Sequence, residues 1–327
     1  MVTVSVIIPV RTITRELRQA VPRLLMLKPA AHELIVVPDK APIEQLPDQV
    51  IVCFQPGGPA AKRDFAARLA TGTVLAFLDD DAYPHSDWLA KALPHFADAS
   101  LAAVGGPAIT PPGEGVWAAV SGAVFTSWLG SGPTRMRYWP TGRVRDVDDW
   151  PSVNLLVRKN VFQNIGGFDT TFWPGEDTKL CLDIVTAGHR IVYDPAAVVY
   201  HHRATTFRKH VRQVARYGLH RGHFVRKFPA TSRRLSYFLP SLTLAGVVAI
   251  TALALAMPAS RAVVGATGAA VVLVITMFAL IEAWRSRRAL VVLLYPWLLL
   301  VTHLTYSTMF IRGWLSPTLS RYGRSTR

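Results

Sequence analysis

The chain has 327 residues, of which 50% are hydrophobic, and its formal net charge is +15. This length allows one α/β domain and additional segments. Two isolated cysteines, Cys53 and Cys181, exclude a disulfide-framed scaffold and are expected to be small buried side chains. The apolar run in residues 1–9 is short and has no basic segment before it, so it predicts a strand rather than a secretory signal. We therefore expect the N-terminal domain to stay in the cytoplasm.

Short apolar runs alternate with amphipathic segments through the first 200 residues. Strands are expected over 4–9, 33–37, 50–54, 73–78 and 191–200, and helices over 16–27, 60–70, 88–96 and 178–186. This alternation predicts an α/β fold with a right-handed, doubly wound, Rossmann-like nucleotide-binding sheet.

Three consecutive carboxylates, Asp79, Asp80 and Asp81, follow the apolar run 73–78. The run is typical of a strand buried on both faces of a parallel sheet. Adjacent anions repel one another, so a folded chain tolerates them best where a cation neutralises them. Open α/β sheets bind ligands at the carboxyl ends of their strands. The cluster therefore predicts a hard-cation site and a metal-dependent enzyme that acts on a phosphorylated donor.

A second acidic group, Glu176 and Asp177, follows Gly175 and begins an expected helix. The positive end of the helix dipole should lower the pKa of these carboxylates and keep them ionised, as a base that accepts a hydroxyl proton requires. A plain N-terminal cap is the alternative. Because the chain also has the acidic cluster at 79–81, we favour the interpretation of Glu176 and Asp177 as a catalytic base over that of a cap. Upstream, Gly166 and Gly167 predict a tight turn.

The composition changes after residue 202. Residues 203–236 are rich in Arg and Lys and predict basic, amphipathic interfacial helices. Residues 237–314 form an expected transmembrane region with apolar segments at about 237–257, 262–283 and 289–312, each long enough to cross a hydrocarbon core of roughly 30 Å. Residues 315–327 form a basic tail. The third segment contains Pro296, so it is either a true span or a broken, re-entrant pair.

Basic residues cluster before the first apolar segment and between the second and third, whereas the first connection holds only Arg261. The positive-inside rule then predicts an in-out-in hairpin for the first two segments of a multi-pass protein of the inner (cytoplasmic) membrane, with the 1–202 domain on the cytoplasmic side. The third segment has basic residues at both ends, which does not fit a simple span. Anionic headgroups are the expected partner of the basic stretch, and nucleic acid is not.

The motifs resemble those of inverting glycosyltransferases of family 2, which have the GT-A nucleotide-diphospho-sugar transferase fold. The resemblance covers about residues 2–225. It rests on Val-Ser-Val-Ile-Ile-Pro9, Phe-Leu-Asp79-Asp-Asp81, Gly166-Gly-Phe-Asp169, Gly175-Glu-Asp177 and Gln213-Val-Ala-Arg216-Tyr217.

The resemblance implies a role for each matching residue. Asp177 would be the general base, with Glu176 beside it. Asp79 and Asp81, with His201, would bind Mg²⁺ or Mn²⁺. Contacts with the donor would come from Pro9, Asp39, Arg63, Asp79, Asp80, Asp81, Gln213, Arg216 and Tyr217, where Tyr217 replaces the family's Trp. Contacts with the acceptor would come from Asn154, Trp173 and Glu176, although Asn154 could instead be a turn residue. Asp64 departs from the family pattern and has no predicted role.

The resemblance also implies a function. The expected activity is transfer of one sugar from a nucleotide-sugar donor, a UDP-sugar in our hypothesis, to a polyprenyl-diphosphate-linked glycan. Such enzymes serve exopolysaccharide and cell-surface glycan assembly, including the succinoglycan type. A processive polysaccharide synthase and a polyprenyl-phosphate glycosyl synthase are the alternative enzymes, and an inactive transferase-fold scaffold is the alternative without catalysis. A homo-oligomer remains open.

Overall fold

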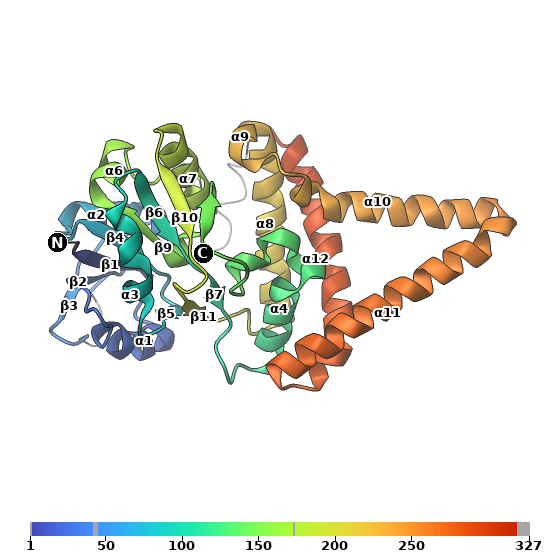
Figure 1. Ribbon diagram of the computed structural model, residues 1–327, viewed down its shortest axis with the longest axis horizontal. Helices are drawn as coiled ribbons and strands as arrows, with labels where there is room; N and C mark the ends of the chain where they lie inside the picture. Colours follow the sequence, from blue (N-terminus) through green and yellow to red (C-terminus); the bar gives the residue numbers. More distant parts are fainter. Residues whose placement is uncertain (1, 42–44, 173, 319–327) are drawn as a thin grey trace. The chain divides into compact units, whose positions relative to one another are not determined.

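The computed structural model describes residues 2–41, 45–172 and 174–318 (Figure 1). The chain forms two compact units, Met1–Pro111 with Met136–His202 and Pro112–Arg135 with Arg203–Arg327. The expected boundary at residue 202 coincides with the junction between the units. Residues 112–135 belong to the second unit, which no feature of their sequence indicated.

The first unit is built on two β-sheets. Among the described residues, the larger sheet has the strand order β3-β2-β1-β4-β9-β6-β10-β8 and the smaller has the order β5-β11-β7. The strands of the larger sheet are β1 (Val4–Pro9), β2 (Glu33–Val37), β3 (Val50–Val52), β4 (Val74–Phe77), β6 (Leu101–Gly105), β8 (Arg145–Val147), β9 (Leu155–Arg158) and β10 (Arg190–Tyr193). Those of the smaller sheet are β5 (Ala82–Pro84), β7 (Ala108–Ile109) and β11 (Val199–His201).

Helices cover both faces of the larger sheet (Figure 1). One core cluster joins it to α1 (Arg15–Leu25) and α3 (Trp88–Ala92), which continues as the 3-10 helix η1 (Leu93–Ala97). The other core joins it to α2 (Pro59–Leu69), α6 (Lys159–Asn164) and α7 (Glu176–Thr186). The strand β4 between these cores is buried along its whole length, as its apolar sequence predicts. The doubly wound α/β prediction is confirmed.

Two details of the predicted sheet are wrong. The sheet is mixed rather than wholly parallel, because β9 runs antiparallel to both β4 and β6. Leu155, the first residue of β9, pairs with Phe77 and Gly105, the last residues of β4 and β6. The chain therefore re-enters the sheet at the carboxyl ends of these strands, and β9 has to run antiparallel to both. The expected strand 191–200 is also divided: β10 ends at Tyr193, and β11 pairs with β5 and β7 instead.

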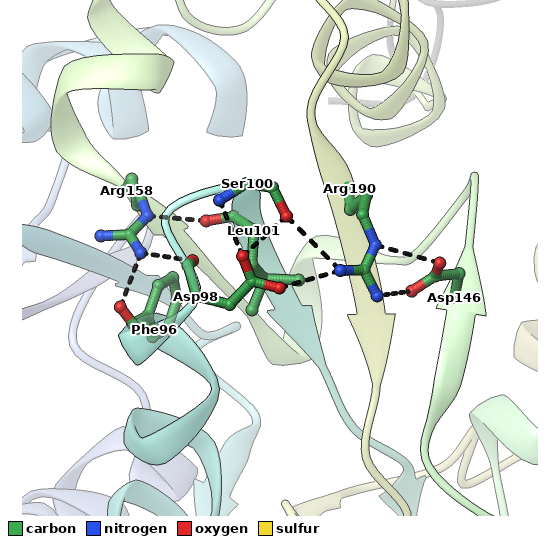
Figure 2. A network of polar contacts seen from close by, with 7 residues as sticks. All are labelled: Phe96, Asp98, Ser100, Leu101, Asp146, Arg158 and Arg190. Carbon is green, nitrogen blue, oxygen red and sulfur yellow. Dashed lines mark hydrogen bonds and ion pairs between the residues drawn. The ribbon is translucent and has the colours of Figure 1, made fainter.

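Charged side chains tie together the edge of the sheet where β6 and β10 begin (Figure 2). Arg190 donates hydrogen bonds to Asp98 and Asp146, each at 2.8 Å. Arg158 donates to the carbonyl oxygens of Leu101 and Phe96, both at 2.6 Å. These bonds lie at the amino ends of β6 and β10, and the carboxyl ends of these strands lie at the opposite edge of the sheet.

The second unit is helical. Its described elements are α4 (Val116–Thr126), α5 (Trp128–Ser131), α8 (Phe207–Lys227), α9 (Pro229–Ser232), α10 (Leu235–Ala256), η4 (Pro258–Ser260), α11 (Arg261–Ser286) and α12 (Leu290–Leu315), and η2 (Gly132–Arg137) lies at its junction with the first unit. Segments Leu235–Ala256, Pro258–Ser286 and Leu290–Leu315 are helical and, by length and composition, apolar enough to cross a membrane. The helix α12 is continuous through Pro296, so, of the two alternatives for this segment, the broken, re-entrant pair is wrong. Tyr295 and Leu298 beside Pro296 are fully buried, and this packing holds the helix together.

Glycines bring α8 and α12 into close contact. A Cβ atom at Gly222 would lie 2.0 Å from the carbonyl oxygen of Phe310, and one at Gly313 would lie 1.9 Å from that of Leu219. His210 of α8 also contacts Thr302 of α12 and Ser121 of α4, each at 2.8 Å. The helices α8, α4 and α12 therefore form one packed layer.

Candidate active site

The acidic cluster lies where the central strand β4 ends. One ligand atom from each of Asp79, Asp81 and His201 lies within 4.8 Å of the others. His201 reaches the cluster because β11 pairs with β5, and its Nε2 lies 3.1 Å from Oδ1 of Asp81. Mn²⁺ binds both carboxylates and imidazole, whereas Mg²⁺ prefers the carboxylate oxygens. These residues therefore fit the expected divalent ion.

The three carboxylates of the cluster have different electrostatic surroundings. Burial and the neighbouring charges of Asp81 and Asp79 raise the pKa of Asp80 to about 7. Burial would also raise the pKa of Asp81, but its hydrogen bond and charge interaction with His201 hold that pKa below the usual value. Asp81 therefore remains ionised and suited to a cation, whereas Asp80 is only partly ionised near pH 7.

Arg63 of α2 connects the two acidic groups. Its guanidinium donates to Oδ1 of Asp79 at 2.6 Å and to Oε1 of Glu176 at 3.2 Å. The Arg63 side chain is only 3% exposed, and its charge lies over the ring of Phe168 at 5.5 Å. One planar cation thus brings the acidic cluster after β4 and the first turn of α7 to the same place, the arrangement on which the predicted site depends.

The acid pair at the start of α7 is largely enclosed. Asp177 accepts hydrogen bonds from the backbone N–H groups of Thr178 at 2.8 Å and Ser152 at 3.3 Å. Burial and the charge of Asp149 raise the pKa of Asp177, and burial and the charge of Asp177 raise that of Glu176 to about 7. The expectation that the helix dipole lowers these pKa values is wrong, because desolvation outweighs the dipole. A raised pKa still suits a base, since it increases proton affinity near neutral pH.

Two residues behind the acid pair were not predicted. Arg137 donates to Oδ2 of Asp149 at 2.6 Å, and both side chains are buried. The other carboxylate oxygen of Asp149 accepts from the Thr178 hydroxyl at 3.1 Å. This chain of contacts orients the first turn of α7. In the sequence Asp149 is one of three nearby aspartates, at 146, 148 and 149, and nothing singles it out.

Asp39 and Pro9 lie at the carboxyl ends of neighbouring strands. Pro9 ends β1 and is buried, and Asp39 follows β2. Lys62, which is 2% exposed, pairs with Asp39 at 2.5 Å and donates to the carbonyl oxygen of Val10. The sequence predicts no role for Lys62. Its pairing leaves Asp39 partly exposed and fixed in position, and the donor contact of Asp39 stays a prediction.

Asp64, for which the sequence offered no role, supports the turn at Gly166 and Gly167. Its Oδ1 accepts from the backbone N–H of Phe168 at 2.9 Å. Gly167 has φ +78°, and a Cβ there would lie 2.6 Å from the same oxygen. Burial raises the pKa of Asp64 to about 6. The turn holds Phe168 against Arg63, so Asp64 acts on the site indirectly.

Asn154 does not fit its expected role. Its side chain is fully buried, donates to the carbonyl oxygens of Ala197 at 2.8 Å and Pro107 at 3.2 Å, and accepts from Nε1 of Trp88 at 2.9 Å. These bonds join separate backbone segments, so the prediction of an acceptor contact is wrong. Trp173, the other expected acceptor contact, lies outside the described residues.

Gln213, Arg216 and Tyr217 lie on α8 in the second unit. Nε2 of Gln213 donates to the Tyr217 hydroxyl at 3.0 Å. Burial and the charge of Arg212 lower the pKa of Arg216. The contribution of these three residues to donor binding stays a prediction.

Taken together, the fold and the acidic groups at the strand ends define a GT-A-type transferase unit followed by apolar helices. The family described as "Glycosyltransferase like family 2" matches residues 4–218, about two thirds of the chain, and the chain belongs to that family.

Several known proteins are similar to the chain. Pre-mycofactocin glycosyltransferase of Mycobacterium tuberculosis is 33% identical over 224 residues, which cover 66% of this chain and 46% of that protein. O-antigen biosynthesis protein RfbC of Myxococcus xanthus is 29% identical over 227 residues, covering 63% of this chain and 18% of that protein. The chain thus spans less than half the length of these relatives.

A solved structure shares the fold over almost the whole chain. Mannosyltransferase PcManGT from Pyrobaculum calidifontis, in complex with GDP-Man and Mn²⁺, superposes with a TM-score of 0.61 at 18% identity. The match covers 93% of this chain and 87% of that one, and at this identity it shows the fold alone.

Proposed function

We propose that the protein is an inverting glycosyltransferase that moves a sugar from a nucleotide-diphosphate donor to a polyprenyl-diphosphate-linked glycan. The observation that carries this proposal is the guanidinium of Arg63, which is bonded to both Asp79 and Glu176. It brings a metal-capable cluster and a buried acid pair close enough to act on one substrate. A non-catalytic scaffold would have no need for two such carboxylate groups around one buried cation.

In the proposed reaction, the acceptor hydroxyl attacks the anomeric carbon of the donor sugar from the face opposite the leaving nucleoside diphosphate. Asp177 takes the hydroxyl proton, since its two backbone hydrogen bonds fix its orientation and burial increases its proton affinity. The C–O bond to the diphosphate breaks as the new glycosidic bond forms, so configuration is inverted. Glu176, held by Arg63, orients the acceptor beside the base.

Asp79, Asp81 and His201 would hold Mg²⁺ or Mn²⁺. When bound, the ion would neutralise charge that develops on the departing diphosphate. The Mn²⁺ and GDP-Man in the structurally similar mannosyltransferase are consistent with this assignment. Asp80, with its pKa raised to about 7, adds less negative charge to the cluster near neutral pH than a carboxylate with the usual pKa would.

The apolar helices support a membrane location and a lipid-linked acceptor. Long apolar helices that follow the catalytic unit would keep it at the bilayer, where polyprenyl-linked head groups are presented. The basic residues around the first two helices favour the cytoplasmic side of the inner membrane. The O-antigen relative is consistent with a role in surface glycan assembly.

The test uses the full chain in detergent. A panel of UDP- and GDP-sugars is first screened by thermal shift with Mn²⁺, and the stabilising donor is then offered with polyprenyl-diphosphate-linked sugars. We expect release of nucleoside diphosphate and addition of a single sugar. A ladder of products would indicate a processive synthase instead, and transfer to bare polyprenyl phosphate would indicate a polyprenyl-phosphate glycosyl synthase. Absence of both donor binding and transfer would refute the proposal.

Two aspartates of α7 form a matched pair of variants. Asp177→Asn should keep donor binding and reduce kcat by about 10²–10⁴-fold, the usual contribution of a general base. Asp183→Asn removes an aspartate that is paired with Lys179 at the outer side of the same helix. It should leave kcat unchanged. Equal rates for the two variants would remove Asp177 from the role of base.

A further inference from the structure

The three apolar helices of the second unit differ in how they are packed. In the most apolar 18-residue stretch of each segment, no residue of α10 is buried and 6% of the residues of Pro258–Ser286 are buried. In α12 the buried share is 33%. The buried side of α12 faces α8 and α4. A helix that is exposed on all sides suits lipid, whereas α12 has one side in contact with protein.

The exposed side of α12 is a largely apolar stripe, in which the exposed Thr308 lies between Leu304 and Ile311. Its large exposed side chains recur at intervals of three, four or seven residues: Leu293, Trp297, Leu300, Leu304, Ile311 and Leu315. At 1.5 Å per residue the stripe is about 33 Å long. Within the described part of the chain, the Trp297 ring packs against Phe207 with centroids 4.6 Å apart, and the large side chains of the stripe remain exposed. A stripe of this size indicates an apolar partner.

The start of α10 contacts the far end of α12. The Phe238 ring packs against Phe310 with centroids 5.1 Å apart, and the Tyr306 hydroxyl donates to the carbonyl oxygen of Tyr237 at 3.2 Å. The end of α11 instead contacts the beginning of α12, since Ala279 and Ala283 belong to the same core cluster as Val291 and Tyr295. Figure 1 shows α10 and α11 leaving the two ends of α12 and meeting at η4. From Val291 to Phe310 these two contact points are about 28 Å apart along α12.

This geometry restricts how α12 can meet a bilayer. The helices α10 and α11 are 22 and 26 residues long, so each can cross a hydrocarbon core of roughly 30 Å alone. A hairpin of two crossings begins and ends on the same side of the membrane. Its two ends, and therefore both ends of α12, must then lie at similar depth. If α12 itself crossed, α10 and α11 together would cross only once.

The helix α8 gives a second, independent argument against a membrane crossing by α12. It runs beside α12, with Gly218 against Tyr306 and Gly222 against Phe310. Between its ends α8 carries the partly exposed residues Arg216 and Arg221. If α12 crossed the bilayer, α8 would be carried into it, and an arginine near the centre costs about 2.5–3.5 kcal/mol on insertion scales.

The positive charges at the ends of the hairpin formed by α10 and α11 support the same placement. Arg233 and Arg234 lie immediately before α10, and Arg287 and Arg288 lie immediately after α11, whereas the other end of the hairpin has only Arg261, the first residue of α11. The positive-inside rule places both bases of the hairpin on the cytoplasmic side. It also accounts for basic residues at both ends of α12, which a crossing helix would not require.

We infer that α12 does not span the membrane but lies along its cytoplasmic surface, with the apolar stripe in the interface and anionic headgroups around it. The partner of the stripe is the lipid bilayer, and α10 and α11 are the two transmembrane helices. This inference does not depend on the proposed transferase activity, and its test does not measure that activity.

The first test maps sidedness with single cysteines in a Cys53→Ser background, in which the remaining Cys181 is buried. Ala259→Cys, Ala289→Cys and Thr318→Cys introduce exposed thiols at the hairpin turn and at the two ends of α12. Spheroplasts and inside-out vesicles are treated with a membrane-impermeant maleimide. We expect positions 289 and 318 to label from the cytoplasmic side and position 259 from the opposite side. Labelling of 289 and 318 from different sides would overturn the inference.

The second test measures depth. Spin labels at Leu293, Leu300 and Ile311, in vesicles that contain phosphatidylglycerol, should show equal and shallow depth by oxygen and nickel accessibility. Labels at Val263, Leu273 and Leu280 of α11 are the matched control and should change steadily in depth. A change of about 27 Å between 293 and 311, as expected for a crossing helix at 1.5 Å per residue, would refute the interfacial placement.

Discussion

Replacement of Arg63 by Met tests whether a single buried cation holds the two acidic groups of the site together. Arg63 has 3% side-chain exposure, and its carboxylate partners Glu176 and Asp79 have 8% and 34%. Removing one partner of a buried ion pair costs about 3–5 kcal/mol, because the remaining charge is left without compensation. For a unit of this size, such a loss corresponds to a fall in Tm of roughly 6–20 °C.

The chain offers a closely matched control. Arg190 also bridges two carboxylates, Asp98 and Asp146, but its side chain is 48% exposed (Figure 2). Water screens these pairs, so Arg190→Met should change Tm little. Both variants remove one positive charge and two ion pairs, and they differ mainly in burial. The Tm of the full chain in detergent, followed by scanning fluorimetry, compares them directly.

A double variant separates charge from packing. Glu176→Gln in the Arg63→Met background removes one of the two carboxyl groups that lose their partner, so at a pH well above 7, where Glu176 is ionised, it should restore part of the lost stability, with a coupling energy of about 1–3 kcal/mol. If Arg63 stabilises the unit only by filling space, the double variant will be no more stable than Arg63→Met. Equal losses in Arg63→Met and Arg190→Met would likewise refute the account based on burial.

Four further outcomes are expected. Because Asp177 must be ionised to take the hydroxyl proton and burial raises its pKa, kcat/KM should fall as the pH is lowered toward that raised pKa, and a flat pH profile would contradict this. Chelation with EDTA should abolish transfer, and His201→Ala should raise the Mn²⁺ concentration for half-maximal rate at least about tenfold, as measured by titration. Gly167→Ala should lower Tm more than Gly166→Ala, since both have positive φ but only the former places a Cβ 2.6 Å from Oδ1 of Asp64.

Much of the architecture could be predicted from local patterns. The strand β4 is apolar at every position, so it has to lie between two packed layers, and the charges that follow it have to lie at the end of the strand. The apolar segments after residue 235 are long enough to predict three helices. These features can be predicted because they depend only on the pattern of apolar and polar residues within a short stretch of sequence.

Long-range geometry could not be read in this way. The reversed direction of β9 follows from the edge at which the chain re-enters the sheet, and the role of Asn154 follows from the carbonyl groups of Pro107 and Ala197 that surround it. The raised pKa of Asp177 likewise could not be predicted from the local sequence. Its position at a helix N-terminus predicts a lowered pKa, but burial in the folded unit outweighs the dipole.

The amino-acid sequence by itself determined the α/β class of the first unit, the acidic residues that carry the proposed chemistry, and the apolar character of the last three helices. Only the tertiary structure decided that Arg63 joins Asp79 to Glu176, and that one side of α12 is covered by α8. The physical reason is that hydropathy and helix caps act over a few residues, whereas desolvation and ion pairing depend on which distant segments meet.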